Sequence, residues 1–169
     1  PREGIYLTQS HLVEAEPAVL PEMTNYAADK IQYIYDTYLA GTDCKGYFAM
    51  VPAKEAFLQK GSLTHEVMGG YFRQELPFLT HLDLTPMMAL EDFYRTDLHW
   101  RQENLLGVAQ KLTEAMGVTD PKAEDFTVTK LDRPFYGVYY GQAALPMAAE
   151  EMFIMDYSED MYLIGTYVA

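Results

Sequence analysis

An aspartate and a histidine two residues apart, Asp97 and His99, are the residue types in this chain that best fit acid–base chemistry. On an extended segment, side chains at positions i and i+2 project from the same face, so the carboxylate can bond one ring nitrogen of the imidazole. The other ring nitrogen is then free to take a proton from a serine hydroxyl or a water. The spacing predicts a general-base pair in which His99 accepts the proton and Asp97 orients the ring.

Two alternatives exist for these residues. Asp97 has the side chain of a helix N-cap, and His99 would then lie in the first turn of the helix that follows. A metal site is the other alternative, because His81 and Asp83 repeat the spacing in reverse order. No helix-borne His-Glu-x-x-His motif or cysteine pair accompanies them, so we expect neither a metal nor a cofactor.

The nucleophile that such a base would serve is not evident in the sequence. The serines are Ser10, Ser62 and Ser158, and none lies in a Gly-Asp-Ser or Gly-x-Ser-x-Gly setting that would expose its oxygen at a strand-to-helix turn. The acidic neighbours Glu159 and Asp160 would raise the cost of forming an alkoxide at Ser158. We therefore expect the nucleophile to lie outside residues 1–169.

Alternating helix and strand patterns predict an α/β fold around this pair. Helical spacing of apolar residues covers residues 24–39, 64–76 and 102–116, and strand-like runs cover residues 4–7, 47–51, 78–84, 126–129, 152–155 and 161–164. Gly41 and Gly117 predict helix ends, and Gly69-Gly70 predicts a kink or split in the second helix. Lys54 follows a strand at its carboxyl end, where open α/β sheets keep their sites, although a lysine there is ordinarily a surface residue.

Composition limits the class of protein. With 169 residues, of which 49% are hydrophobic, the chain fits one domain with a core of its own. The net charge of −13 argues against nucleic acid and anionic membranes as partners. The sequence contains no run of eighteen apolar residues, the length that a membrane span needs, and its first residues do not predict a signal peptide. The single cysteine, Cys44, is expected to be a free buried thiol, and nothing indicates the oligomeric state.

Residues 94–100, which read Tyr-Arg-Thr-Asp-Leu-His-Trp, resemble the DHHW family of the SGNH-hydrolase-like superfamily. That family is similar to the alginate O-acetyltransferase-like proteins of bacterial cell surfaces. The strand-like Tyr-Phe-Ala-Met-Val-Pro at residues 47–52 and the aromatic, glycine-containing run at residues 135–141 extend the resemblance over most of the chain. In the family a later Asp-Ser motif supplies the serine, so the resemblance places the nucleophile beyond Ala169.

The family pattern reads Asp-His-His-Trp-Thr and then a small Gly-Ala pair, and this chain departs from it in three places. Leu98 replaces the first His, Arg101 replaces the Thr, and Asn104-Leu105 replaces the small pair. The Asp-x-His is retained. A divergent or inactive site is therefore one of the expectations that follow from the comparison.

The resemblance implies an SGNH-like or flavodoxin-like three-layer partial domain at residues 1–169, with residues 118–169 as a β-rich extension. It implies transfer or hydrolysis of an O-acetyl ester on a carbohydrate or cell-wall glycan, by a secreted or membrane-anchored surface protein whose anchor lies outside this chain. Tyr94 and Trp100 would pack beside the site or stack against a sugar ring, with core packing the favoured role of Trp100. Independently of the resemblance, Arg73 would face an anionic group if its predicted helix lines a groove. The alternative is a non-catalytic surface or glycan-binding module that keeps the fold and has lost the chemistry.

Overall fold

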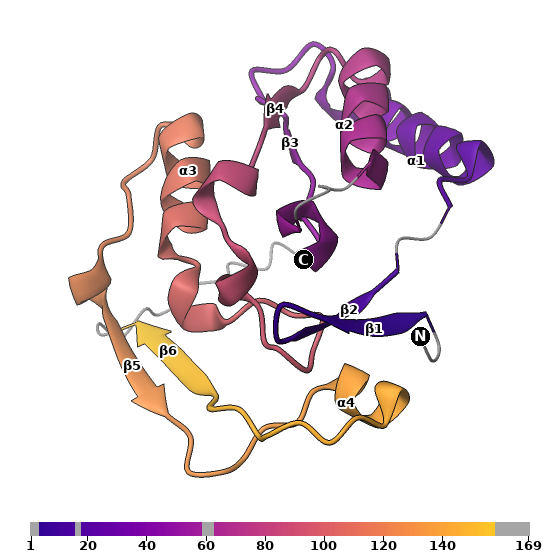
Figure 1. Ribbon diagram of the computed structural model, residues 1–169. Helices are drawn as coiled ribbons and strands as arrows, with labels where there is room; N and C mark the ends of the chain where they lie inside the picture. The colour runs from indigo at the N-terminus through magenta and orange to yellow at the C-terminus, as the bar shows by residue number, and fades with distance from the viewer. Residues whose placement is uncertain (1–3, 16–17, 59–62, 158–169) are drawn as a thin grey trace, which may run out of the picture.

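The computed structural model of the protein describes residues 4–15, 18–58 and 63–157. It is a mixed α and β structure in which the described strands form three small sheets of two strands each, and the β1–β2 and β5–β6 pairs lie at its periphery (Figure 1). The α/β class predicted from the sequence is confirmed at this level. Within the described residues the strands do not join into one continuous sheet.

The N-terminal strands β1 (Ile5–Thr8) and β2 (His11–Glu14) form an antiparallel hairpin. Its turn residues Gln9 and Ser10 both have positive φ, 46° and 69°, as a tight two-residue hairpin turn requires. The sequence predicted the first strand but not the second, whose four residues His-Leu-Val-Glu do not alternate between polar and apolar. The hairpin supplies Ile5 and Leu12 to a small buried cluster with the short helix α4 (Val138–Ala143).

The central strands β3 (Tyr47–Ala49) and β4 (Thr80–Leu82) pair in parallel, with helix α2 (Leu63–Glu75) in the connection between them. The predicted interruption of this helix at Gly69-Gly70 is wrong, because α2 is continuous. Packing of one face of α2 against the rest of the molecule stabilises the helix and offsets the low helix propensity of the two glycines.

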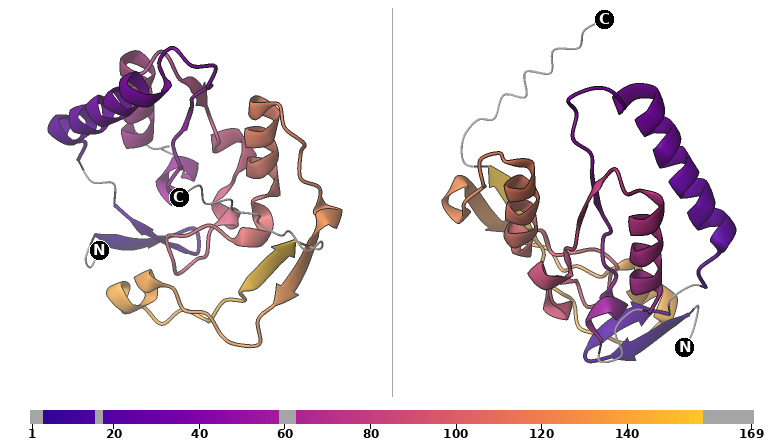
Figure 2. Two further views of the ribbon diagram at one scale, coloured as in Figure 1. Left: turned by 180° about the vertical axis from the view of Figure 1, so that it is seen from behind. Right: turned by 90° about the horizontal axis from the view of Figure 1, so that it is seen from above.

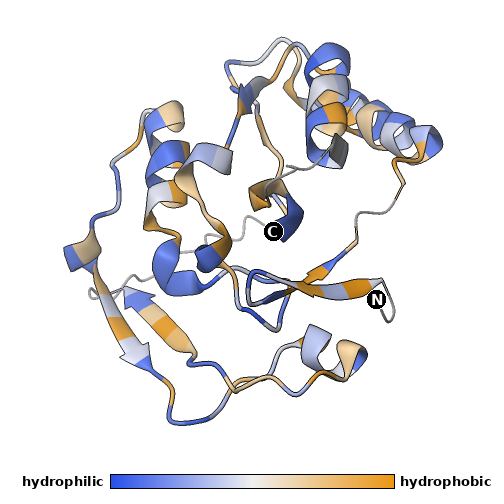
Figure 3. Ribbon diagram, viewed as in Figure 1, coloured by the Kyte–Doolittle hydropathy of each residue, from blue (hydrophilic) through white to orange (hydrophobic). Residues whose placement is uncertain are grey.

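Helix α1 (Pro21–Ile34) continues into a π-helical turn (Tyr35–Leu39), and Gly41 follows with a φ of 80°. The predicted helix at residues 24–39 and its glycine stop are confirmed. Helices α1 and α2 lie against each other and bury Ala28, Phe72 and Leu76 as a second cluster (Figure 2). Polar and apolar residues are mixed along both helices, as expected for helices with one covered face (Figure 3).

The remaining elements are helix α3 (Leu106–Met116) and the strands β5 (Phe126–Lys130) and β6 (Phe153–Tyr157). Gly117 ends α3 in the left-handed conformation with a φ of 68°, as the sequence predicted. Strands β5 and β6 pair antiparallel across a long connection that contains α4. The strand predicted at residues 161–164 lies outside the described residues.

Two predictions about single features have clear outcomes. Cys44 is a free thiol, but it is exposed in the loop before β3, so the expectation of a buried thiol is wrong. Among the described residues, no helix combines the length and the apolar character needed to cross a bilayer.

Candidate functional site

Asp97 and His99 lie in a tight loop that is closed by an antiparallel bridge between Phe93 and Trp100. One carboxylate oxygen of Asp97, Oδ1, lies 2.9 Å from the backbone nitrogen of His99 and 2.5 Å from its ring Nδ1. The expected extended segment is wrong, because residues 94–99 form turns. The carboxylate reaches the imidazole because an Asp side chain readily bonds the backbone N–H two residues later.

The two side chains have very different surroundings. Asp97 is buried, with 9% of its side chain exposed, whereas 73% of the His99 side chain is exposed. With the proton on Nδ1 donated to Asp97, the neutral ring presents a lone pair at Nε2. Within the described ranges Nε2 has no hydrogen-bond partner, so it is available to a molecule in solution.

The second oxygen of Asp97, Oδ2, accepts a hydrogen bond of 2.8 Å from the backbone N–H of Val138, the first residue of α4. Asp97 therefore does not cap the helix that follows it in the chain, which begins after Leu105. Burial by itself raises the pKa of the Asp97 carboxyl. The hydrogen bonds from Val138 and His99 outweigh that effect and lower the pKa below its ordinary value, which keeps the group ionised beside the imidazole.

Glu150 holds the loop from the other side. Its carboxylate accepts hydrogen bonds from the backbone N–H groups of Arg95 at 2.6 Å and Thr96 at 2.8 Å, and from the Thr96 hydroxyl at 2.6 Å. Burial raises the pKa of Glu150. The hydrogen bonds from Thr96 and Arg95 lower it by more than burial raises it, so the pKa lies below its ordinary value. Sequence analysis missed Glu150, since nothing near it in the chain marks an acidic residue of the run Ala-Glu-Glu-Met as buried.

Thr96 links the loop to the start of α4. Its hydroxyl oxygen accepts a hydrogen bond of 2.9 Å from the Gly137 N–H, and its carbonyl oxygen accepts one of 3.0 Å from the Tyr139 N–H. A Cβ atom added to Gly137 would lie only 2.3 Å from that carbonyl oxygen. A glycine is therefore required here for close approach of two backbones.

Lys54 lies beneath the same loop. Its Nζ donates to the carbonyl oxygens of Leu12 at 2.8 Å and Arg95 at 3.5 Å, and only 4% of the residue is exposed. The expectation of an ordinary surface lysine is wrong. Burial lowers the pKa of Lys54 to about 8, although the negative charges of Glu150 and Asp97 act in the opposite direction.

A cavity of about 430 Å³ lies beside the loop. Its wall includes Leu98 and Trp100, the two neighbours of His99, together with Lys54 and Tyr139. The Tyr139 hydroxyl donates to a Glu14 carboxylate oxygen at 3.1 Å. The cavity therefore combines apolar and aromatic walls with a few polar groups, as small-molecule sites commonly do.

The other residues predicted at the site lie in different surroundings. Tyr94 is buried; its ring centre lies 4.7 Å from that of Phe135, and the central carbon of the Arg101 guanidinium lies 5.4 Å from the Tyr94 ring centre. Trp100, next to His99 in the chain, lines the cavity of about 430 Å³. Arg73 lies on α2 and lines a separate cavity. The predicted contributions of Tyr94, Trp100 and Arg73 to substrate binding stay predictions.

The alternative metal site is not assembled. The His81 ring bonds the Leu76 carbonyl oxygen at 2.9 Å, and Asp83 accepts a hydrogen bond from the Thr85 N–H at 2.9 Å. In the ranges that the structure describes, no three His, Cys, Asp or Glu side chains are grouped so that they could hold a metal ion. The four residues of the alternative therefore do not form a ligand set.

Of the three serines, Ser10 is described, and it is exposed in the β1–β2 turn. Ser62 and Ser158 lie outside the described residues. The described part of the site thus provides a candidate base and its orienting carboxylate, and the source of a nucleophile stays a prediction.

Comparison with known proteins gives the class of fold. No family model and no curated protein matches the sequence. The structure is similar to that of a DHHW family protein from Eubacterium siraeum, with a TM-score of 0.72 and 16% identity over 94% of this chain and 56% of that one. It is also similar to Bacillus cereus PatB1, with a TM-score of 0.61 and 17% identity over 91% of this chain and 58% of that one.

The chain thus has the fold of a DHHW family protein, and the resemblance noted in the sequence is confirmed at the level of the fold. It spans less than two thirds of the length of both solved structures.

Proposed function

We propose that residues 1–169 supply the general base of an SGNH-like carbohydrate O-acetyltransferase or acetylesterase of a bacterial cell surface, in a three-layer α/β domain. The observation that supports this most is the 2.5 Å contact between Asp97 and the Nδ1 of His99, with Nε2 open to solvent. An ionised carboxylate on one ring nitrogen and an accessible lone pair on the other are the requirements for general-base catalysis.

In the proposed reaction an acetyl group is transferred in two steps, and His99 takes and returns a proton in each step. His99 Nε2 takes the proton of a serine hydroxyl as the serine oxygen attacks the acetyl carbonyl, and the imidazolium returns that proton to the departing oxygen of the donor ester. The acetyl group then passes from serine to a glycan hydroxyl, or to water in an esterase, with His99 taking and returning a proton again. The serine would come from residues outside this chain.

The surroundings of the pair support this assignment. Glu150, Thr96 and Gly137 fix the loop with hydrogen bonds, so Asp97 is held in place while the His99 ring remains accessible. The cavity of about 430 Å³ beside the loop has room for an acetyl ester or part of a sugar ring. Trp100 in its wall has the flat apolar face on which a sugar ring can stack.

The test uses the natural full-length protein and a chromogenic acetyl ester, followed by acetylated glycans. We expect His99→Ala and Asp97→Asn to lower kcat by at least about a hundredfold, the scale of lost general-base catalysis. His81→Ala is the matched control, since it removes an imidazole that is bonded to the Leu76 carbonyl. Unchanged turnover in His99→Ala would remove the enzymatic proposal.

A non-catalytic glycan-binding module is the second candidate. Leu98, which stands at the first His of the family pattern, is 47% exposed and lies in the cavity wall, where it adds apolar surface without acid–base chemistry. Retention of the full-length protein on an immobilised glycan, with no release of acetate from acetylated forms of that glycan, would favour this candidate. Loss of that retention in Trp100→Ala would assign the cavity as the binding surface.

A further inference from the structure

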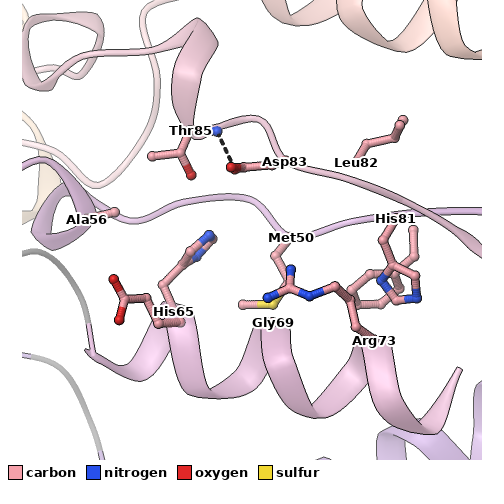
Figure 4. Close-up of a pocket in the computed structure, with 11 residues that line it drawn as sticks. Met50, Ala56, His65, Gly69, Arg73, His81, Leu82, Asp83 and Thr85 are labelled. Atoms are coloured by element: carbon pink, nitrogen blue, oxygen red, sulfur yellow. Dashed lines mark hydrogen bonds between the residues drawn. The ribbon is translucent and has the colours of Figure 1, made fainter. Parts of the chain in front are cut away.

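A second cavity, of about 260 Å³, lies between α2 and the chain at the ends of β3 and β4 (Figure 4). Polar groups in its wall come from three residues of α2, from β4 and from the segment after it: His65, Glu66, Arg73, His81, Asp83 and Thr85. Its apolar wall is formed by side chains of both strands and their flanks, Phe48, Met50, Ala56 and Leu82. The acyl-transfer proposal assigns no step to this cavity.

The Arg73 side chain lies along one face of α2. His65, Gly69 and Arg73 are spaced four residues apart and so lie on that face. The Arg73 guanidinium lies over Gly69, with Nη1 3.6 Å from the position that a Cβ would take, an ordinary van der Waals distance. The side chain runs back along α2 above Met50, with its guanidinium in the cavity (Figure 4).

Within the described residues the exposed Arg73 guanidinium forms no ion pair, although the carboxylates of Asp83 and Glu66 line the same cavity. The ion pairs found there involve other residues, and Asp83 is bonded to Thr85. The Thr85 hydrogen bonds and the nearby charges of His65 and Arg73 lower the pKa of Asp83, which indicates that these groups share one electrostatic environment.

We propose that this cavity binds a small monocarboxylate through the guanidinium of Arg73. A planar fork of N–H donors matches the two oxygens of a carboxylate, and the apolar wall suits a short alkyl group attached to it. Asp83 and Glu66, which also line the cavity, repel an anionic ligand, and they repel a doubly charged ligand more strongly than a singly charged one. This disfavours inorganic phosphate and selects a singly charged acid of a few carbon atoms, as the volume requires.

NMR titration of the protein with propionate tests the site. We expect saturable shifts of the Arg73 Nε–H and of the α2 backbone amides, with a dissociation constant in the millimolar range. Neither 1-propanol, which lacks the charge, nor inorganic phosphate should reproduce the shifts. The absence of shifts with propionate, or equal affinity for phosphate, would overturn the proposal.

Two variants separate recognition from general charge effects. Arg73→Gln is expected to weaken propionate binding about tenfold or more through loss of the charge-assisted fork, and Arg133→Gln, the same change at an exposed arginine, should leave it unchanged. If Arg73→Gln does not fold, Arg73→Lys takes its place, and unchanged affinity there would contradict recognition by the fork. His99→Ala should bind propionate normally, so failure of the acyl-transfer proposal would leave this site intact.

Discussion

The carboxylate of Glu150 accepts hydrogen bonds from both the backbone N–H and the hydroxyl of Thr96, although the two residues are 54 positions apart in the chain. Thr96 precedes Asp97, so this contact fixes the loop that holds the carboxylate against the imidazole. The geometry of Asp97 and His99 therefore depends on a residue from the segment between α4 and β6.

Replacement of Glu150 by Gln is expected to destabilise the fold by about 2 to 4 kcal/mol. Arg95 and Thr96 donate to different carboxylate oxygens, so the amide nitrogen of Gln would face the N–H of one of them, and the bond to the other would lose its charge assistance. Glu151→Gln is the control, because Glu151 is exposed and pairs with Lys130 at the surface. Urea unfolding measures both variants, and equal effects of the two would contradict the proposed importance of Glu150 to the loop.

Replacement of Gly137 by Ala is expected to lower the free energy of unfolding by about 1 to 3 kcal/mol. The added methyl group would overlap the Thr96 carbonyl oxygen and the Asp97 Cβ, so the loop and α4 must move apart. Gly141→Ala, within α4 and with nothing within 4 Å of the new atom, should be neutral or stabilising. Thermal unfolding of the two variants gives the comparison, and a neutral Gly137→Ala would show that close approach is not required.

Lys54 is expected to make stability rise with pH above about 8. Its folded pKa of about 8 lies below the ordinary 10.5, so between these values the unfolded chain binds more protons than the folded one. The free energy of unfolding should therefore gain at most about 1.4 kcal/mol per pH unit from this group. Urea unfolding at pH 7 to 10 should show a smaller rise of the unfolding free energy with pH in Lys54→Met than in the exposed control Lys45→Met. Equal pH dependence of the two variants would contradict the burial of the Lys54 charge.

Asp97 is expected to stabilise the fold at neutral pH and to lose that effect in acid. Its folded pKa lies below the ordinary 3.8, so the folded state favours the ionised carboxylate, and the contribution disappears as pH falls through the folded value. The difference in unfolding free energy between the wild type and Asp97→Asn should be about 1 to 3 kcal/mol at pH 7 and should shrink below pH 4. A difference that stays constant down to pH 2 would show that the charge of Asp97 is not involved.

The sequence predicted the local features of this fold. Helical spacing located the three long helices, Gly41 and Gly117 marked two ends, β5 followed from a short alternating run, and β6 followed from a short apolar run. These features depend on residues that are neighbours in the chain or one turn apart. The continuous course of α2 through Gly69-Gly70 could not be predicted, because contacts of α2 with α1 and β3 decide it.

The sequence also determined that Asp97 and His99 can meet, since a carboxylate two residues before an imidazole reaches it through a local turn. Only the tertiary structure decided that the carboxylate is buried and the imidazole exposed, because the burial comes from α4, and Glu150 and Lys54 hold the loop in place. Their contacts join residues about 40 to 55 positions apart. Neither spacing nor composition encodes which distant segments the chain brings together, since that depends on the packing of whole elements.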